Sequence, residues 1–285
     1  MPQQLKQALW RDIGTLPAQH DSLYLLLDGA LLDAPLVAYS NDDNPIVEPL
    51  YRGTRHEPAL SVSPCLVKPS AQSKLWQQQD QWRSKGVVLY CQEPIASLRQ
   101  HLQSLISVRS PSQQLAYCRY YSPAWLASLL DTLSPAEVSS WSGPIKGWYA
   151  YFDNSWSCAE VDAPGEPRKL KDEGWFVLKQ QQLDHWQTQE YQRFVDKAAE
   201  HLGCYTSSSE AGRRQRAAVA ALTREAHEFG FLMEYQCLHY LELAWRFPKE
   251  LVSPLIAGML RNPEQQPDQR LQLAEQQLFG LNKDV

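Results

Sequence analysis

Two short stretches of this chain are apolar almost without interruption, which restricts the folds open to it. They are Ser22–Leu27 and Gly86–Cys91, each about as long as one β-strand. An apolar run without polar alternation is typical of a strand that is buried on both faces of a sheet. Asp28 and Gly29 follow the first run and end it. We therefore expect a sheet whose inner strands are covered on both sides.

The segments around these two runs alternate between strand and helix signals. Leu36–Ser40 is expected to be extended, Leu60–Val67 to be a strand with a bulge or an edge at Pro64, and Ser73–Ser84 to be a helix. Strand, helix and strand in this spacing predict a βαβ unit with a parallel pair. Further helices are expected at Leu5–Arg11, after Pro94 and at Ala124–Leu133, and further strands at Leu115–Tyr121, Ile145–Phe152 and Trp156–Val161.

The pattern changes after residue 162. Ala163–Glu173 is rich in charge, proline and glycine, as in a loop or lobe boundary, and Gly174–Leu178 is expected to be a last short strand. Every later segment has helical periodicity, with helices expected at about 182–203, 208–229, 234–247, 250–260 and 268–279. The predicted fold is α+β or α/β: a mixed sheet with flanking helices in residues 1–178, and an all-helical lobe in residues 179–285.

Composition excludes several classes of function. The chain has 285 residues, 44% of them hydrophobic, and a net charge of −5, so the basic footprint of a nucleic-acid binder is missing. The glutamine-rich start has no apolar core of a signal peptide, and no stretch has the roughly 20 uncharged residues of a membrane span. Six dispersed cysteines with apolar neighbours indicate small buried side chains in a reducing compartment. We expect a cytoplasmic protein with no nucleic-acid or membrane partner.

Motifs of common enzymes are missing from the sequence. GxSxG, GxxxxGK[ST] and GxGxxG do not occur. His227-Glu228 begins like the zinc motif HExxH, but Phe231 stands where the second histidine is needed. We therefore expect no catalytic residues, no metal ligands and no cofactor. An enzyme that draws its carboxylates from distant loops stays an alternative.

Seven segments follow one another in an order that is found in a known family. They are Leu27–Ala30, Pro49–Thr54, Ser63–Lys68, Cys118–Pro123, Ser142–Trp148, Tyr191–Asp196 and Phe229–Phe231. Together they resemble the spike–effector adaptors, or effector chaperones, of bacterial type VI secretion, a family first catalogued as a domain of unknown function. The resemblance covers roughly residues 20 to 280. One motif departs from the family: Ser122 stands where an aspartate is common before Pro123.

The resemblance implies a non-catalytic cytosolic protein that binds a toxic effector, through the N-terminal segment of that effector, and loads it onto the VgrG spike. It also implies an α/β lobe followed by a helical lobe. A generic protein-binding scaffold or regulator outside secretion is the alternative, beside an enzyme of unrecognised type.

Four residues of the first lobe are predicted to have a structural role. Asp28 and Arg119 lie at the ends of apolar strands, and we expect Arg119 to make charge-assisted hydrogen bonds to a carboxylate or to loop carbonyls, Asp28 being one candidate partner. Tyr121 and Pro123 belong to the same strand-to-helix junction, which Ser122 is expected to cap.

The partner surface is predicted on the helical lobe. Apolar residues of the expected helix 234–247 exceed one core-facing stripe of about 100°, so the helix is either covered all round or partly exposed. We expect part of it to line an aromatic cleft for the effector. The candidate residues are Tyr235, Leu238, Tyr240, Trp245, Trp186 and Tyr191.

Overall fold

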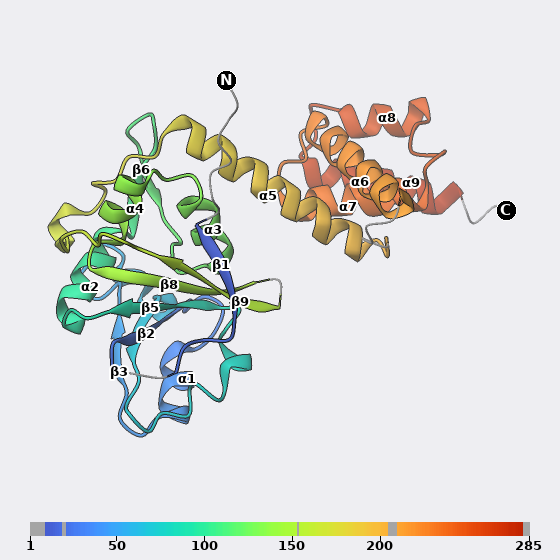
Figure 1. Cartoon of the computed structure of the whole chain (residues 1–285). Coiled ribbons are helices and arrows are strands. Elements are labelled where there is room, and N and C mark those ends of the chain that lie inside the picture. The colour runs from blue at the N-terminus through green and yellow to red at the C-terminus, as the bar shows by residue number, and fades with distance from the viewer. Residues whose placement is uncertain (1–8, 19–20, 153, 205–209, 282–285) are drawn as a thin grey trace. The chain divides into compact units, whose positions relative to one another are not determined.

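The computed structural model describes residues 9–18, 21–152, 154–204 and 210–281. The chain divides into two compact units, Met1–Trp186 and Gln187–Val285. The first unit holds all the strands of the described residues, and the second is built from helices (Figure 1). This arrangement confirms the predicted α+β class, with helices concentrated in the C-terminal part.

The first unit is organised around a seven-stranded sheet in which every pairing is antiparallel. Its order is β1-β9-β8-β5-β2-β4-β3. The two apolar runs form the neighbouring inner strands β2 and β5, and all five residues of β2 are buried. The bounds are β1 Trp10–Gly14, β2 Leu23–Leu27, β3 Ile46–Pro49, β4 Cys65–Lys68, β5 Gly86–Cys91, β8 Ile145–Phe152 and β9 Ser155–Glu160.

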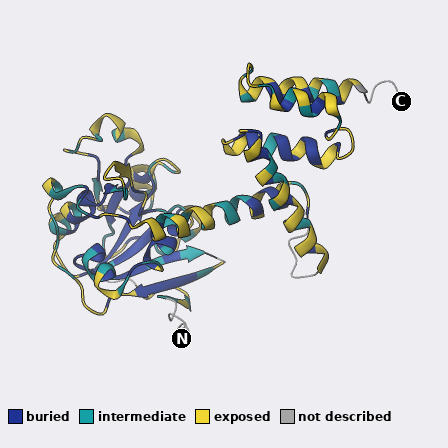
Figure 2. Cartoon of the chain, turned by 90° about the horizontal axis from the view of Figure 1, so that it is seen from above, coloured by how far each residue is buried: buried dark blue, intermediate teal, exposed yellow. Residues whose placement is uncertain are grey.

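Both faces of the sheet are covered, as continuous apolar strands require. Leu26 and Leu89 contribute to one core, together with helices α2 (Ile95–Ser104), α3 (Pro123–Leu130) and α4 (Pro135–Ser142). Leu25 and Val88 contribute to the opposite core, together with α1 (Ala34–Asn41) and the segment that contains Trp82. All five residues of β2 and five of the six residues of β5 are accordingly buried, and strands of this unit are dark blue in Figure 2.

The predicted parallel βαβ pair is wrong. β2 pairs antiparallel with both β4 and β5, and no α-helix forms at 73–84, where only the short 3₁₀ turn Gln79–Gln81 occurs. Trp82 explains the difference, because its indole nitrogen donates to the carbonyl of Leu75 at 3.0 Å and folds the segment back on itself. Burial of Leu75 and Trp82 in the core thus overrides helical periodicity.

Two other local predictions are corrected. Leu36–Ser40 is part of α1 and not extended, since Asp33 caps that helix by accepting a hydrogen bond from the Leu36 backbone nitrogen at 3.0 Å. Trp10 and Arg11, placed in an N-terminal helix, belong instead to strand β1, which pairs with β9. Residues 5–8 of that expected helix lie outside the described residues.

A second, two-stranded sheet lies beside the main one. β6 (Ser107–Arg109) pairs antiparallel with β7 (Leu115–Tyr117), and Val177 adds one parallel bridge to Arg109. The predicted strand Leu115–Tyr121 is therefore confirmed only over its first three residues. The 3₁₀ turn Leu170–Asp172 precedes the Val177 bridge.

All five predicted C-terminal helices are confirmed, with ends shifted by a few residues. Their bounds are α5 Gln180–His201, α6 Glu210–Glu228, α7 Glu234–Arg246, α8 Pro254–Arg261 and α9 Pro267–Leu281. Phe231, Tyr240, Ile256 and Leu278 are fully buried in the main core of this unit. Helical spacing of apolar residues was thus a reliable guide here.

The six cysteines are all buried and reduced, as expected from their apolar neighbours. Burial raises the pKa of the Cys65 thiol to about 12 and that of Cys91 to about 11. These thiols stay protonated at neutral pH and act as small apolar side chains.

Candidate functional site

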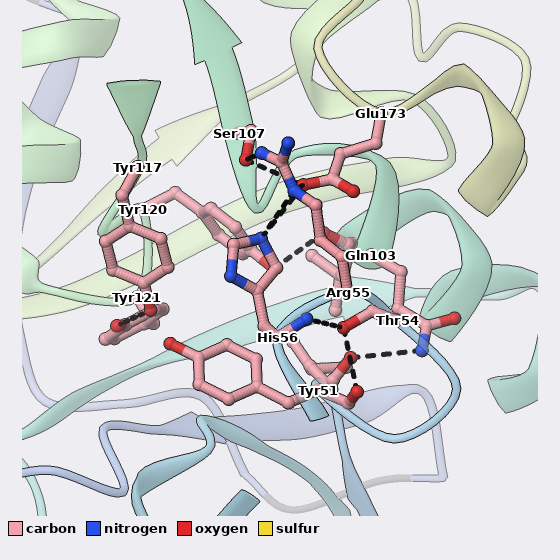
Figure 3. Close-up of polar contacts among 12 residues, drawn as sticks. Tyr51, Thr54, Arg55, His56, Gln103, Ser107, Tyr117, Tyr120, Tyr121 and Glu173 are labelled. Carbon is pink, nitrogen blue, oxygen red and sulfur yellow. Dashed lines mark hydrogen bonds and ion pairs between the residues drawn. The ribbon is translucent and has the colours of Figure 1, made fainter. Parts of the chain in front are cut away.

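The loop after strand β3 is held in one conformation by several hydrogen bonds (Figure 3). Gln103 of α2 donates to the carbonyls of Leu50 and Arg52, both at 3.0 Å. The Thr54 hydroxyl donates to the carbonyl of Tyr51 at 2.8 Å, and Gly53 between them has a φ of +73°, which glycine adopts most readily. Residues 49–56 therefore form a fixed platform, here called the 49–56 loop.

The 49–56 loop presents Arg55 and His56 to one carboxylate. Glu173 Oε1 lies 3.0 Å from His56 Nε2 and 3.3 Å from Arg55 Nε, and it accepts a hydrogen bond from the Ser107 hydroxyl at 2.6 Å. A carboxylate only accepts hydrogen bonds, so a hydrogen bond from His56 to Glu173 requires the tautomer with the proton on Nε2, which then cannot accept from Arg55 Nε, 3.3 Å away. Arg55 also donates to the Ser107 hydroxyl at 2.5 Å. The network ties the loop to β6 and to the segment before residue 177.

This polar network does not have the order of a Ser–His–acid triad. In a triad the histidine lies between the hydroxyl and the carboxylate, so that it can take the proton of the nucleophile. Here Glu173 lies between Ser107 and His56 and accepts hydrogen bonds from both sides, and Ser107 is buried. The arrangement is suited to fixing three segments together.

Aromatic side chains lie beside this network. The His56 ring is 5.5 Å from that of Tyr51 and 5.7 Å from that of Tyr117, which is 45% exposed. The hydroxyls of Tyr117 and Tyr121 are 2.6 Å apart, and burial raises the pKa of both phenols. Both tyrosines therefore remain neutral hydrogen-bonding groups at physiological pH.

The predicted pairing of Asp28 with Arg119 is present. Arg119 Nη2 donates to Asp28 Oδ2 at 2.5 Å, and Asp28 also accepts from the Ala30 backbone nitrogen at 3.0 Å. The two partners differ in exposure: the Arg119 side chain is 47% exposed, whereas that of Asp28 is 1% exposed. The exposed guanidinium of Arg119 therefore forms an ion pair with the buried carboxylate of Asp28, which follows β2.

The junction after Arg119 differs in one detail from the expectation. Pro123 is the first residue of α3, and Tyr121 is buried, its ring 5.7 Å from that of Tyr120. Ser122 occupies the N-cap position, but its side chain makes no capping hydrogen bond. Proline at the first turn lacks the N–H that would need a cap, which lowers the demand for one.

We expect Arg119→Ala to lower the free energy of unfolding by about 2 kcal/mol, because the buried carboxylate loses a charge-assisted hydrogen bond but keeps the Ala30 backbone nitrogen. Urea unfolding measures this loss. Arg11→Ala is the matched control, since its partner Glu160 is exposed, and it should cost well under about 1 kcal/mol. An unchanged melting temperature together with lost partner binding would instead give Arg119 a role in recognition.

The candidate residues on α7 have different surroundings. Tyr240 is fully buried, with its ring 5.5 Å from Phe229 and 5.8 Å from Phe231. It is a core residue and is not accessible to a partner. Leu238 is half-buried beside a smaller core, while Tyr235 is 61% exposed and its hydroxyl donates to Asp268 at 3.1 Å. Trp245 is 37% exposed.

Trp186 and Tyr191 both lie on α5 but belong to different units. Trp186 is half-buried in the first unit, where its ring lies 6.2 Å from that of Trp125. Tyr191 is half-buried in the second unit, and its hydroxyl donates to the carbonyl of Ala220 at 2.8 Å. Both therefore have packing roles within their own units.

An apolar groove of about 500 Å³ lies on the second unit, and Trp245 lines it. α6 contributes the small side chains of Ala218 and Ala221, and Val252, which is 71% exposed, lines the groove as well. Glu225 is the one charged residue among the lining residues. Of these residues only Trp245 was predicted as a binding residue from the sequence, because the two alanines look like ordinary helix positions. We call this feature the α6–α7 groove; its other lining residues are Leu222, Ala244, Pro248 and Leu251.

Among the described residues, no group of three or more histidine, cysteine or acidic side chains is placed to hold a metal ion. Over the same residues, no helix combines the length and the apolar character that crossing a bilayer takes.

Comparison with known proteins gives one result. No curated protein and no solved structure matches the chain significantly. Residues 23–140, which run from β2 into α4 and include the 49–56 loop, match the model of a family described as a domain of unknown function (DUF4123).

Proposed function

We propose that this chain is a non-catalytic adaptor that binds a type VI secretion effector and loads it onto the VgrG spike. Two observations support the proposal. The family match over residues 23–140 agrees with the resemblance to effector-associated adaptors. The α6–α7 groove, which carries the proposal, offers an apolar surface of the kind that binds an amphipathic helix of a partner.

The composition of the groove fits a protein segment as its ligand. Its lining is almost wholly apolar, and it has small alanines on one side and an exposed tryptophan on the other. Alanine positions allow a partner helix to approach closely, and tryptophan is a frequent energetic anchor of interfaces. We propose that the N-terminal segment of the effector binds here, with its apolar side chains between Trp245 and Val252.

The proposal is tested by purifying the chain from its native host and identifying what accompanies it. An effector-like toxin and a spike protein are the expected partners. Deletion of the gene should abolish secretion of that effector. Recovery of proteins unrelated to secretion would favour the generic scaffold, whose groove would have the same properties.

The groove itself is tested by filling it. Ala221→Arg places a long charged side chain in the α6–α7 groove without removing any packing, and arginine is a good helix former. We expect at least about a tenfold loss of effector capture, as for the loss of a hot-spot contact. Binding of the purified effector segment to each variant by calorimetry measures the loss.

The matched control is Ala217→Arg, which lies on the same helix, is exposed and does not line the groove. It should bind the effector segment like the original chain, and both variants should melt within a few degrees of it. Equal capture by Ala221→Arg would exclude the groove as the effector site.

A further inference from the structure

A basic hollow of about 440 Å³ lies on the first unit, beside the 49–56 loop. The hollow is lined by Arg52 from the loop, Arg99 from α2, Lys171 from the 3₁₀ turn and Lys169, which directly precedes that turn, and by no carboxylate. The chain as a whole has a net charge of −5, so this concentration of positive charge runs against its average. Like charges gathered at one hollow repel one another, and an anionic ligand would relieve this repulsion.

The backbone around the hollow is held by hydrogen bonds that do not neutralise its positive charge. Gln103 holds the carbonyl of Arg52, and the side chain of Asp172 accepts a hydrogen bond from the backbone nitrogen of Lys169 at 3.1 Å. These contacts position the backbone at Arg52 on one rim and at Lys169 on the other. They do not involve the cationic groups of the two side chains. The rims therefore need little rearrangement to receive a ligand.

Few of the four cations are neutralised by the protein. Arg99 pairs with Glu48 at 3.1 Å, yet its Nε is buried without a hydrogen-bond partner. Within the described parts of the chain, Arg52, Lys169 and Lys171 form no ion pair and are exposed. Glu57 lies nearby, but one of its carboxylate oxygens accepts from the Gly53 backbone nitrogen. Three cations thus remain available to a ligand.

We infer that the basic hollow binds a carboxylate-rich segment of a partner protein. The identity of that partner as the effector or the spike rests on the proposed function, whereas the charge recognition does not. Three cations on opposite rims suit carboxylates spaced along an extended peptide, since each ammonium or guanidinium can meet a separate one. The apolar α6–α7 groove and the basic hollow then serve chemically different segments.

The test uses a fluorescein-labelled peptide of alternating glycine and glutamate, with the matching glycine–glutamine peptide as the neutral control. Fluorescence anisotropy with the full chain at pH 7.5 should show binding of the glutamate peptide only, weakening as salt is raised. The double variant Lys169→Glu with Lys171→Glu should bind it at least about tenfold more weakly, because two attractive contacts become repulsive.

Lys74→Glu with Lys197→Glu is the matched control, since both lysines are exposed, neither lines the hollow, and the net charge changes equally. It should retain binding within about twofold, as expected for distant surface charges in salt. Equal binding by the two double variants, or binding of the glutamine peptide, would overturn the inference. Full displacement by millimolar inorganic phosphate would overturn it as well, because a small-anion site would then explain the charge.

Co-purification separates this inference from the proposed function. If the Lys169→Glu with Lys171→Glu variant loses one partner and keeps the other, the inference and the proposed function are both supported. If both partners accompany the hollow variant as they do the original chain, and peptide binding is unchanged, the inference fails while the adaptor function remains. If neither partner accompanies the original chain but the peptide binds, the adaptor function fails alone.

Discussion

Gly143→Ala should lower the free energy of unfolding of the first unit by about 3 kcal/mol or more, through backbone strain and a steric clash together. Gly143 ends α4 with a φ of +52° and a ψ of −121°, a conformation that residues with a side chain rarely adopt. A Cβ atom there would lie 2.4 Å from Cε1 of His101, whose ring is fully buried. The ring cannot move away freely, because it is hydrogen-bonded on both sides.

The control for this prediction is Gly53→Ala. Gly53 also has a positive φ, +73°, but a Cβ atom there would meet nothing within 4 Å. It should therefore cost only the roughly 1–2 kcal/mol of the left-handed backbone. Chemical unfolding of both variants measures the difference. Gly143→Ala combined with His101→Ala should be less destabilising than the sum of the two single changes, since removal of the ring relieves the clash. Strict additivity would show that the ring is not the obstacle.

Much of the first unit could be predicted from its strands, but their pairing could not. The continuous apolar runs at β2 and β5 correctly indicated strands covered on both faces. Pairing direction depended on the connection, and Trp82 turned the expected helix into a folded loop through a contact seven residues away. Such a contact leaves no periodic signal in the sequence. The helices of the second unit were predictable because their apolar spacing coincides with their packing.

In the candidate sites, too, some features could be predicted from the sequence and others could not. Asp28 and Arg119 could be proposed as partners because each was expected at the end of an apolar strand, although β7 ends at Tyr117 and is exposed. Their unequal exposure depends on the three-dimensional surroundings. Tyr240 and Trp245 lie five residues apart on one helix, yet one is in the core and the other lines a groove. The basic hollow unites residues 52, 99, 169 and 171, which no local motif connects. Sites assembled from separate segments become visible only once the chain is folded.

Acidification from pH 7.5 to pH 5 should destabilise the first unit by about 2 kcal/mol through His101 alone. Burial lowers the pKa of His101 from 6.5 to about 4. Its Nε2 donates to the carbonyl of Trp141 at 2.9 Å, and its Nδ1 accepts from the Arg168 backbone nitrogen at 3.2 Å, which fixes the neutral ring. A second proton on Nδ1 would break the latter bond and place a charge in the core.

The direction of this pH dependence follows from the number of protons bound by the folded and the unfolded chain. Between pH 6.5 and about 4 the unfolded chain binds a proton at His101 and the folded chain does not, so protons favour unfolding in this window. The stability is fully present above pH 6.5 and is lost as the pH falls toward 4. The pKa of Glu137 is lowered to about 2, so its own contribution is lost only below pH 4.5 and does not confuse the comparison.

Urea unfolding at several pH values between 5 and 7.5, for the original chain and for His101→Gln, checks this prediction. Glutamine can still donate to the Trp141 carbonyl but does not titrate, so the variant should be less stable at pH 7.5 and should lose less stability on acidification. Parallel curves for the two proteins would show that His101 is not the titrating group.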